Sequence, residues 1–406
     1  MNENKIEKKE NRFEIKYKKL KEMVMIFEKK ISLMIGRMIV LLLLVFLISE
    51  SIFSSVYFVY NLKKINDVQG NDLYKNQPWL NKYNEERKLG EAKYSPYIGY
   101  KSKEFSGKYI NIGEDSLRST FNTCNTNDSK KFFMFGGSTL WGEYARDNYT
   151  IPSYFSKKLC SYGMNIVVSN FGSGGYTTSE EMITLIMELR KGNIPDYVIF
   201  YDGVNDVGCA YLNNKSGYPP NAKAREDEFN LRKKINIIEP FYQQTSTGRI
   251  IAKVFGNDAN GYELTIKTPR DETNLDKLSN ETAEVYLNNL EIIEALSSHY
   301  NFTAFYFLQP NLYTKKELSS NERILITTEE YTRLGRFYNR TYDTIVILEK
   351  QNKYKFYDIR YIFNEVNGSV YYDTSHHISE EGNRIVGERI AEIIYDYMMG
   401  DDDGTG

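Results

Sequence analysis

The 406-residue sequence has few cysteines, few histidines and almost no net charge. Its three cysteines, Cys124, Cys160 and Cys209, lack the spacing of metal ligands, so they allow at most one disulfide within the chain and do not identify a redox compartment. A formal net charge of −2 provides no positive field that would favour a nucleic acid as a partner. We also find no internal repeat. The composition is otherwise that of an ordinary globular protein, and the chain is long enough for one large domain with attachments.

The scarcity of histidine limits the chemistry that the chain can perform. The three histidines are His299, His376 and His377. His299 lies in a stretch of helical periodicity that precedes an apolar strand, so we interpret it as structural. Adjacent side chains such as His376 and His377 diverge, and no further ligand is evident beside them, so we expect neither a metal site nor a cofactor. A reaction that needs an imidazole must use one of this pair.

The N-terminal region differs from the rest of the chain. Residues 1–32 are rich in lysine and glutamate and have apolar residues at helical spacing, which predicts a cytoplasmic basic arm, either helical or disordered. Residues 33–61 contain a long apolar run, and about 23 residues at roughly 1.5 Å each span the ~30 Å hydrocarbon core. A cleaved signal peptide and a buried helix are the alternatives. The long basic lead-in and the lack of a small-residue cleavage site favour a retained transmembrane helix.

Charge around this apolar run predicts its orientation. Lysine and arginine crowd its N-terminal side, so we expect the N-terminus in the cytoplasm and the remainder outside a cell membrane that is crossed once. Seven Asn-x-Ser/Thr sequons follow the run. In a sequence so rich in asparagine several arise by chance, and they are compatible with an exported glycoprotein: Asn127, Asn148, Asn214, Asn280, Asn301, Asn339 and Asn367.

The chain beyond the apolar run divides by composition. Turn residues are frequent in residues 62–127, which we interpret as a stalk and entry segment. Residues 128–400 form the main predicted domain, and within it residues 208–281 are polar and read as an insertion over one end of a sheet. Residues 401–406, with three consecutive aspartates, are expected to be a disordered tail.

Strand and helix patterns alternate throughout the main domain. Alternation of this kind predicts a parallel sheet that is covered by helices on both faces. The expected strands are 131–136, 165–171, 196–202, 302–308 and 354–359. The expected helices are 151–162, 178–191, 282–299, 328–351 and 379–398.

Candidate functional residues follow the ends of these strands. An apolar run, Phe132 to Phe135, stops at Gly136-Gly137 and is followed by Ser138. Open α/β sheets bind their ligands outside the carboxyl ends of the strands. A Gly-Gly-Ser turn taken alone is more often only a turn.

Three further segments lie at comparable positions: a glycine cluster at 172–175, the sequence Gly203-Val204-Asn205-Asp206, and Asp373 to His377 before the last helix. Each has a plain structural interpretation, as a tight strand–helix turn, a left-handed turn or a surface loop.

Together and in this order, the four segments resemble the SGNH (GDSL-like) hydrolase family, in its Gly-Gly-Ser branch. The matching residues are Ser138, Gly175, Asn205, and Asp373 with His376, and the resemblance covers about residues 130–398. The chain departs from the family at Gly137, where the GDSL form has Asp, and in having two adjacent histidines. The resemblance implies a three-layer α/β/α flavodoxin-like sandwich around a five-stranded parallel sheet of order 2-1-3-4-5.

The chemistry of the matched residues agrees with this resemblance. A serine hydroxyl needs an adjacent base to act as a nucleophile, and Asp373 is close enough in sequence to orient a histidine and to stabilise its charged form. The backbone amides of Ser138 and Gly175 and the side-chain amide of Asn205 would donate to the oxyanion.

Two ways of counting choose different histidines. The family spacing Asp-x-x-His selects His376. Counting back from the helix, whose expected N-cap is Ser379, leaves one apolar residue, Ile378, between cap and histidine and selects His377. We predict His376, because the Asp–His separation is part of the chemistry and the loop to the helix can lengthen freely.

The sequence therefore predicts a membrane-anchored serine esterase or deacylase that acts outside the cytoplasm through an acyl-serine intermediate. Two alternatives remain: an O-acyltransferase that acetylates a cell-surface glycan through the same serine, and a non-catalytic glycan-binding or assembly protein on the same fold. The expected partners are an acyl ester, on a surface glycan or a lipid, and the membrane. Nothing in the sequence identifies the acyl chain.

Overall fold

The computed structural model describes residues 3–69, 73, 77–124, 126, 128–220, 222–232, 272–351 and 354–400. The chain divides into two compact units. One contains Met1–Lys64 and Asn230–Asp258, and the other contains Ile65–Phe229 and Ala259–Gly406. The expected tail 401–406 lies outside the described residues.

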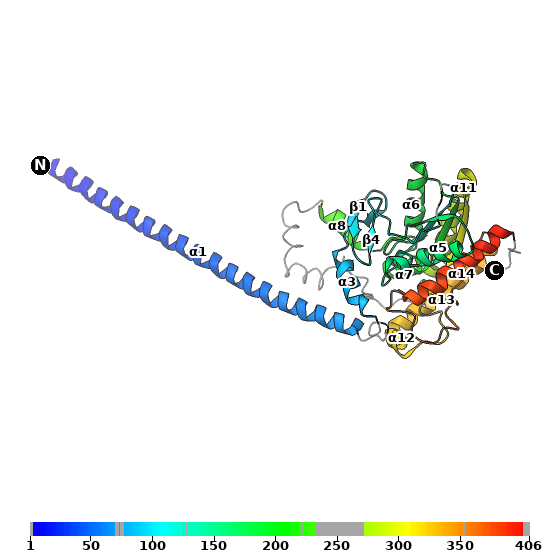
Figure 1. Cartoon of the computed structure of the whole chain (residues 1–406). Helices are drawn as coiled ribbons and strands as arrows, with labels where there is room; N and C mark the ends of the chain where they lie inside the picture. The colour runs from blue at the N-terminus through cyan, green and yellow to red at the C-terminus, as the bar shows by residue number, and fades with distance from the viewer. Residues whose placement is uncertain are drawn as a thin grey trace. The chain divides into compact units, whose positions relative to one another are not determined.

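The first unit is dominated by α1 (Glu3–Gln69), a continuous helix of 67 residues (Figure 1). Its segment Lys16–Ser55 is long and apolar enough to cross a membrane, with a mean hydropathy of 2.8 in its most apolar window and none of that window buried in the protein. This segment is a candidate membrane span. Of the two forms expected for the basic arm, the described part is helical, and the helix begins before residue 33 and extends beyond residue 61.

The second unit is built on a five-stranded parallel sheet. Its strands are β5 (Lys130–Gly136), β6 (Ile166–Asn170), β7 (Tyr197–Asp202), β8 (Thr303–Leu308) and β9 (Phe356–Asp358). They lie in the order β6-β5-β7-β8-β9, which confirms the 2-1-3-4-5 topology that the family resemblance implied. The central strands are apolar without alternation because both of their faces are buried.

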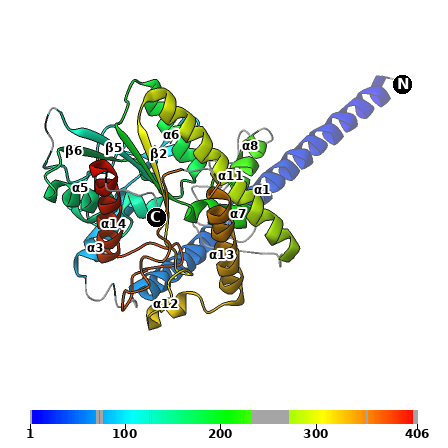
Figure 2. The ribbon, with the colours of Figure 1, turned by 90° about the vertical axis from the view of Figure 1, so that its right-hand side faces the viewer.

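Helices cover both faces of the sheet and complete a three-layer sandwich (Figure 2). On one face, Phe132 and Met134 of β5 pack with residues of α5 (Ile151–Ser161) and α14 (Glu380–Met399). On the other face, Phe133 and Phe135 pack with residues of four helices: α6 (Thr178–Arg190), α7 (Val204–Asn213), α11 (Glu272–Tyr300) and α13 (Glu329–Glu349). Alternate residues of one strand thus serve two separate cores.

Every expected strand and helix of the main domain is present, with ends that differ mostly by one or two residues. The exception is α11, which begins at Glu272, ten residues before the expected start. The expected insertion is described only in part. It contains the end of α7, the helix α8 (Ala222–Arg232) and the start of α11, while residues 233–271 lie outside the described residues. The helices α7 and α8 and a short helix, α12 (Ser320–Leu325), were not expected.

The entry segment is folded against the sheet. It comprises α3 (Trp79–Leu89), a hairpin of β1 (Ala92–Ser95) and β2 (Gly99–Ser102), and a small hairpin of β3 (Phe105–Ser106) and β4 (Asn111–Ile112). Arg118 makes backbone bridges to Ile112 and to Asn170 at the end of β6. Leu80 and Tyr83 of α3 join a third apolar cluster that also contains Trp141 and Tyr372. This segment therefore contacts the carboxyl edge of the sheet.

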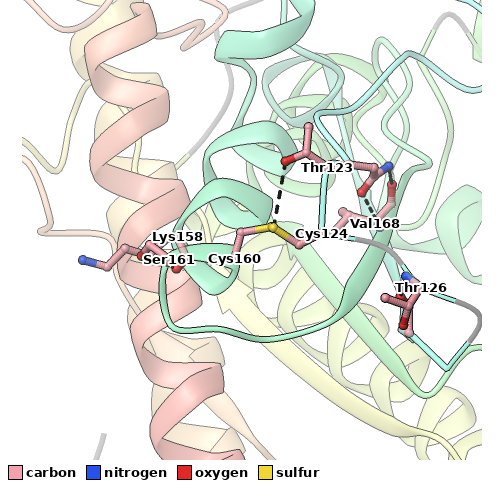
Figure 3. The surroundings of a disulfide bond; sticks show 9 residues. Thr123, Cys124, Thr126, Lys158, Cys160, Ser161 and Val168 are labelled. Carbon is pink, nitrogen blue, oxygen red and sulfur yellow. Dashed lines mark hydrogen bonds between the residues drawn. A yellow bond between two sulfur atoms is a disulfide. The ribbon is translucent and has the colours of Figure 1, made fainter.

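A disulfide joins the end of the entry segment to the first covering helix. Cys124 is bonded to Cys160 of α5, with 5.8 Å between their Cα atoms and a sequence separation of 36 (Figure 3). A cross-link of this loop length typically contributes about 2–4 kcal/mol to stability. Cys209 is free and buried.

Candidate active site

Ser138 begins a short helix directly after β5. The helix α4 (Ser138–Trp141) follows Gly137, which has an extended backbone. A Cβ on Gly136 would lie 2.6 Å from the carbonyl oxygen of Tyr201, and a Cβ on Gly137 would lie 2.2 Å from Nδ2 of Asn205. A side chain at Gly136 would strike the backbone of β7, and one at Gly137 would displace the Asn205 amide, so the pair lets the strand end beside β7 and brings the serine next to Asn205.

Ser138, His377 and Asp373 form a chain of short hydrogen bonds. Nε2 of His377 lies 2.8 Å from Oγ of Ser138, and Nδ1 lies 2.7 Å from Oδ2 of Asp373. With Asp373 ionised, its oxygens only accept, so Nδ1 carries the proton and Nε2 accepts the serine hydroxyl. All three side chains are partly or largely buried.

The turn before α14 determines which histidine reaches the serine. Oδ1 of Asp373 accepts the N–H groups of Ser375 at 3.0 Å and His377 at 3.3 Å. His376 has a φ of +66°, in the left-handed region. One extra residue therefore separates Asp373 from His377, the histidine that contacts Ser138. Ser379 caps α14, as the sequence predicts.

The preference for His376 is therefore wrong in its geometry. The ring of His376 is buried away from Ser138, and its Nδ1 accepts the backbone N–H of Leu312 at 3.1 Å. Three tyrosine rings surround it, those of Tyr313, Tyr338 and Tyr371. Asp373 and His377 still form their hydrogen bond at the longer spacing, because the left-handed φ of His376 brings the two ends of this turn closer together.

The two histidines have opposite pKa shifts. Burial alone lowers the pKa of His377, but the charge of Asp373 and its hydrogen bond outweigh burial and raise that pKa above its ordinary 6.5. Burial raises the pKa of Asp373, and the neighbouring His377 then brings it below its ordinary value. Burial lowers the pKa of His376 to about 3. His377 can accept a proton near neutral pH, whereas His376 remains a neutral acceptor.

The three expected oxyanion donors lie in the loops after β5, β6 and β7. Gly175 has a φ of +77°, and Asn205 follows Gly203, whose φ is +102°. Nδ2 of Asn205 donates to the carbonyl of Tyr176 at 2.7 Å, which uses one of its two hydrogens. Within the described part of the chain, neither the N–H of Ser138 nor that of Gly175 donates to a protein acceptor.

Sequence reasoning missed the residues that hold the loop after Ser138. Arg118 is fully buried and donates to the carbonyls of Trp141 at 3.0 Å, Gly142 at 2.6 Å and Ala145 at 2.5 Å. Glu143 donates its N–H to the carbonyl of Ser138 at 3.0 Å. A single arginine in a polar entry segment belongs to no motif, so no sequence signal identifies it.

A group of buried carboxyl groups lies behind Asn205. Its members are Glu180 and Glu181 of α6, Asp202 at the end of β7, and Asp206 of α7. Burial is the first cause that raises each pKa, to about 7 for Glu180, about 8 for Asp202 and about 6 for Asp206, while that of Glu181 is also well raised. Among the described residues, no cluster has the geometry of a metal site. Because their pKa values are raised to about 7 and about 8, Glu180 and Asp202 keep part of their protons at neutral pH.

These carboxyl groups should make the protein less stable at alkaline pH. Their pKa values are higher in the folded than in the unfolded chain, so their contribution is complete at acidic pH and is lost as pH rises through about 6 to about 8. Glu181→Gln mimics the protonated form. Near about pH 8.5 we expect the variant to melt several degrees above the wild type, since 1 kcal/mol of stability corresponds to about 2–4 °C. Near about pH 5 the two melting temperatures should be equal. Equal melting at both pH values would contradict this.

The histidines can be separated by substitution. His377→Asn should lower ester turnover by about 10³-fold or more, because it removes the base. His376→Asn should keep turnover within about tenfold, since asparagine tolerates a left-handed φ and its carbonyl can accept the Leu312 N–H. The opposite order of the two losses would restore His376 as the base.

The pH profile should report His377. The base works only when neutral, so kcat/KM should fall as pH drops through a pKa above 6.5. Asp373→Asn should lower kcat by about 10⁴-fold. The fall of its residual activity on the acid side should move to a lower pH, because the charge that raises the pKa of His377 is gone. An unchanged limb would show that another group titrates.

Comparisons with known proteins found similar structures but no sequence family. A scan against models of protein families found no match, and a search of curated proteins found none either. A search of solved structures found similar chains. One is a member of the lipolytic G-D-S-L family from Veillonella parvula, with 11% identity, a TM-score of 0.37, and coverage of 66% of this chain and 99% of the other.

Two further similar structures are a lipase and an esterase. The lipase, from a goat rumen metagenome, has 14% identity and a TM-score of 0.39, with 66% of this chain and 98% of the other covered. A catalytic mutant of an acetylxylan esterase from Geobacillus stearothermophilus has 13% identity and a TM-score of 0.36, with 66% and 95% covered. At these identities the comparisons assign no reaction to this chain, and the assignment depends on the site itself. The three-layer sandwich and its strand order 2-1-3-4-5 are observed directly in the second unit.

Proposed function

We propose that the chain is a membrane-anchored serine esterase or deacylase that works outside the cytoplasm. The observation that carries this proposal is the hydrogen-bonded chain from Ser138 through His377 to Asp373. A serine becomes nucleophilic when a base takes its proton, and a buried carboxylate keeps that base in the right tautomer.

The reaction has two halves. In the first, Nε2 of His377 takes the Ser138 proton while Oγ attacks the ester carbonyl carbon, and the same imidazolium then protonates the leaving alkoxide. The acyl group is left on Oγ. In the second half His377 takes a proton from water, the hydroxide attacks the acyl carbon, and the carboxylic acid leaves as Ser138 regains its proton. No cofactor is needed for either half.

Both tetrahedral intermediates place negative charge on the former carbonyl oxygen. The N–H groups of Ser138 and Gly175 and the second hydrogen of Asn205 Nδ2 are the donors that we assign to it, since none of them is used by a protein acceptor. Gly137 belongs to this arrangement as well, because a side chain there would displace the Asn205 amide.

Location outside the cytoplasm is supported by two features. The apolar segment of α1 is preceded by a lysine-rich stretch, which favours an N-terminus inside. The Cys124–Cys160 disulfide belongs to an oxidising compartment, since cytosolic thiols are kept reduced. The substrate on this side of the membrane would be an acyl ester of a surface glycan or lipid.

Covalent labelling tests the nucleophile. The full-length chain in detergent should react with a fluorophosphonate, and peptide mass spectrometry should place the adduct on Ser138. Ser138→Ala should abolish both labelling and ester turnover with little change in melting temperature. Ser161→Ala is the matched control, because Ser161 is exposed on α5 and its hydroxyl donates to the carbonyl of Lys158.

The outcomes of labelling discriminate between the functions. Native protein that is never labelled would indicate the non-catalytic binding protein. Labelled protein should next be given acetyl and longer acyl esters, with and without a sugar acceptor. Release of free acid in water supports the esterase, whereas faster transfer of the acyl group to the sugar would identify an acyltransferase.

Thiol accessibility tests the orientation. In intact cells, a membrane-impermeant protease should digest the second unit, and denatured protein should show one thiol, that of Cys209, before reduction and three afterwards. Three thiols before reduction, together with protection from the protease, would place the domain in the cytoplasm.

A further inference from the structure

Tyr100 in β2 contacts the loop that carries the Gly175 donor. Its hydroxyl donates to the carbonyl oxygen of Gly174. That carbonyl and the N–H of Gly175 belong to the same planar peptide unit and point in opposite directions, so a bond that fixes the oxygen also fixes the direction of the N–H. The described residues contain no cis peptide bond.

This peptide lies at the centre of a turn that the N–H of Tyr176 closes by donating to the carbonyl of Ser173 at 3.2 Å, a bond that uses neither the Gly174 carbonyl nor the Gly175 N–H. A Cβ placed on Gly174 would meet no atom within 4 Å, so the space beside the peptide is open. On the other side of Gly175, the hydroxyl of Tyr176 donates back to the carbonyl of Tyr100, and the two rings meet edge to face with centroids 5.4 Å apart. Tyr100 therefore holds the glycine loop on both sides of Gly175.

The hairpin and the insertion keep Tyr100 in place. Tyr100 pairs with Tyr94 across the hairpin, and the guanidinium of Arg225 in α8 lies 5.6 Å from the centre of its ring. Burial raises the pKa of Tyr100 and that of Tyr176, so both phenols remain protonated and able to donate.

We propose that Tyr100 is a positioning residue that aims the N–H of Gly175 at the developing oxyanion. The hydrogen bond to the Gly174 carbonyl also polarises the peptide and makes its N–H a stronger donor. The inference rests on the proposed function of Gly175 and extends it, because Tyr100 lies outside the residues 130–398 that carry the family resemblance. The entry segment, which follows the apolar helix in sequence, then helps to position a donor of the site.

Tyr100→Phe in the full-length chain removes only the hydroxyl and keeps the ring between Tyr176 and Arg225. We expect kcat to fall by about 10- to 100-fold, less than the 10²–10³ lost with a direct donor, and KM to change by less than about twofold. Tyr94→Phe is the matched control: it lies opposite in the same hairpin, is 82% exposed and should behave as the wild type.

Binding of a transition-state mimic separates aiming from mere packing. A boronic acid that forms a charged tetrahedral adduct should lose affinity in Tyr100→Phe by the same factor as kcat/KM, while a neutral amide analogue of the ester should bind unchanged. Tyr176→Phe removes the reciprocal bond but leaves Gly174 held, so it should cost much less. Equal losses in Tyr100→Phe and Tyr176→Phe, or equal losses for both ligands, would overturn the proposal.

Failure of this inference is distinct from failure of the proposed function. A wild type that turns over esters and is inactivated by Ser138→Ala, with Tyr100→Phe as active as Tyr94→Phe, would reject only the role of Tyr100. A wild type without turnover or labelling would reject the function itself. If Tyr100→Phe lowers the melting temperature, the ratio of the two affinities, measured on folded protein, still decides.

Discussion

All five strands of the central sheet run in one direction, and this constraint brings the site together. Because parallel strands share one carboxyl edge, Ser138 after β5, Gly175 after β6 and Asn205 after β7 come from loops that open on the same side. The contact between Gly137 and the Asn205 amide shows how closely two of these loops approach. His377 reaches the same place from the turn before α14, although it lies 239 residues from Ser138 in sequence.

The entry segment restrains this edge from outside the sheet. Arg118 holds three carbonyls of the loop after Ser138, and Tyr83 of α3 accepts the N–H of Tyr144 while donating to the carbonyl of Gly142. Tyr100 holds the glycine loop. Short catalytic loops have few contacts of their own, so a separate layer of hydrogen bonds gives them a single conformation. Here that layer comes from the part of the chain that follows the candidate membrane span in sequence.

Much of the fold could be predicted from the sequence because strong, local signals carry it. Unbroken apolar runs mark β5, β7 and β8, and Ser379 with two following glutamates marks the start of α14. The entry segment was not predicted in detail because its strands are only two to four residues long and are held by distant partners. The start of α11 was missed because its first turns are polar.

The candidate site shows the same division. Ser138, Asn205 and Asp373 could be located by motif, since each stands at a strand end or before a capped helix. The choice of histidine could not, because spacing counts residues and does not see the left-handed φ of His376 or the tyrosine-lined space that receives its ring. Arg118 and Tyr100 act through single long-range contacts, for which a single sequence offers no pattern.

The central claim is that His377 activates Ser138 to form an acyl-serine. The most direct measurement is rapid quenching of the full-length protein during turnover of an activated acetyl ester, followed by mass spectrometry of its peptides. The account predicts an acetyl group on Ser138 that forms in the wild type and in His376→Asn but not in His377→Asn. An acetyl group on another residue, or one that forms equally without His377, would contradict it.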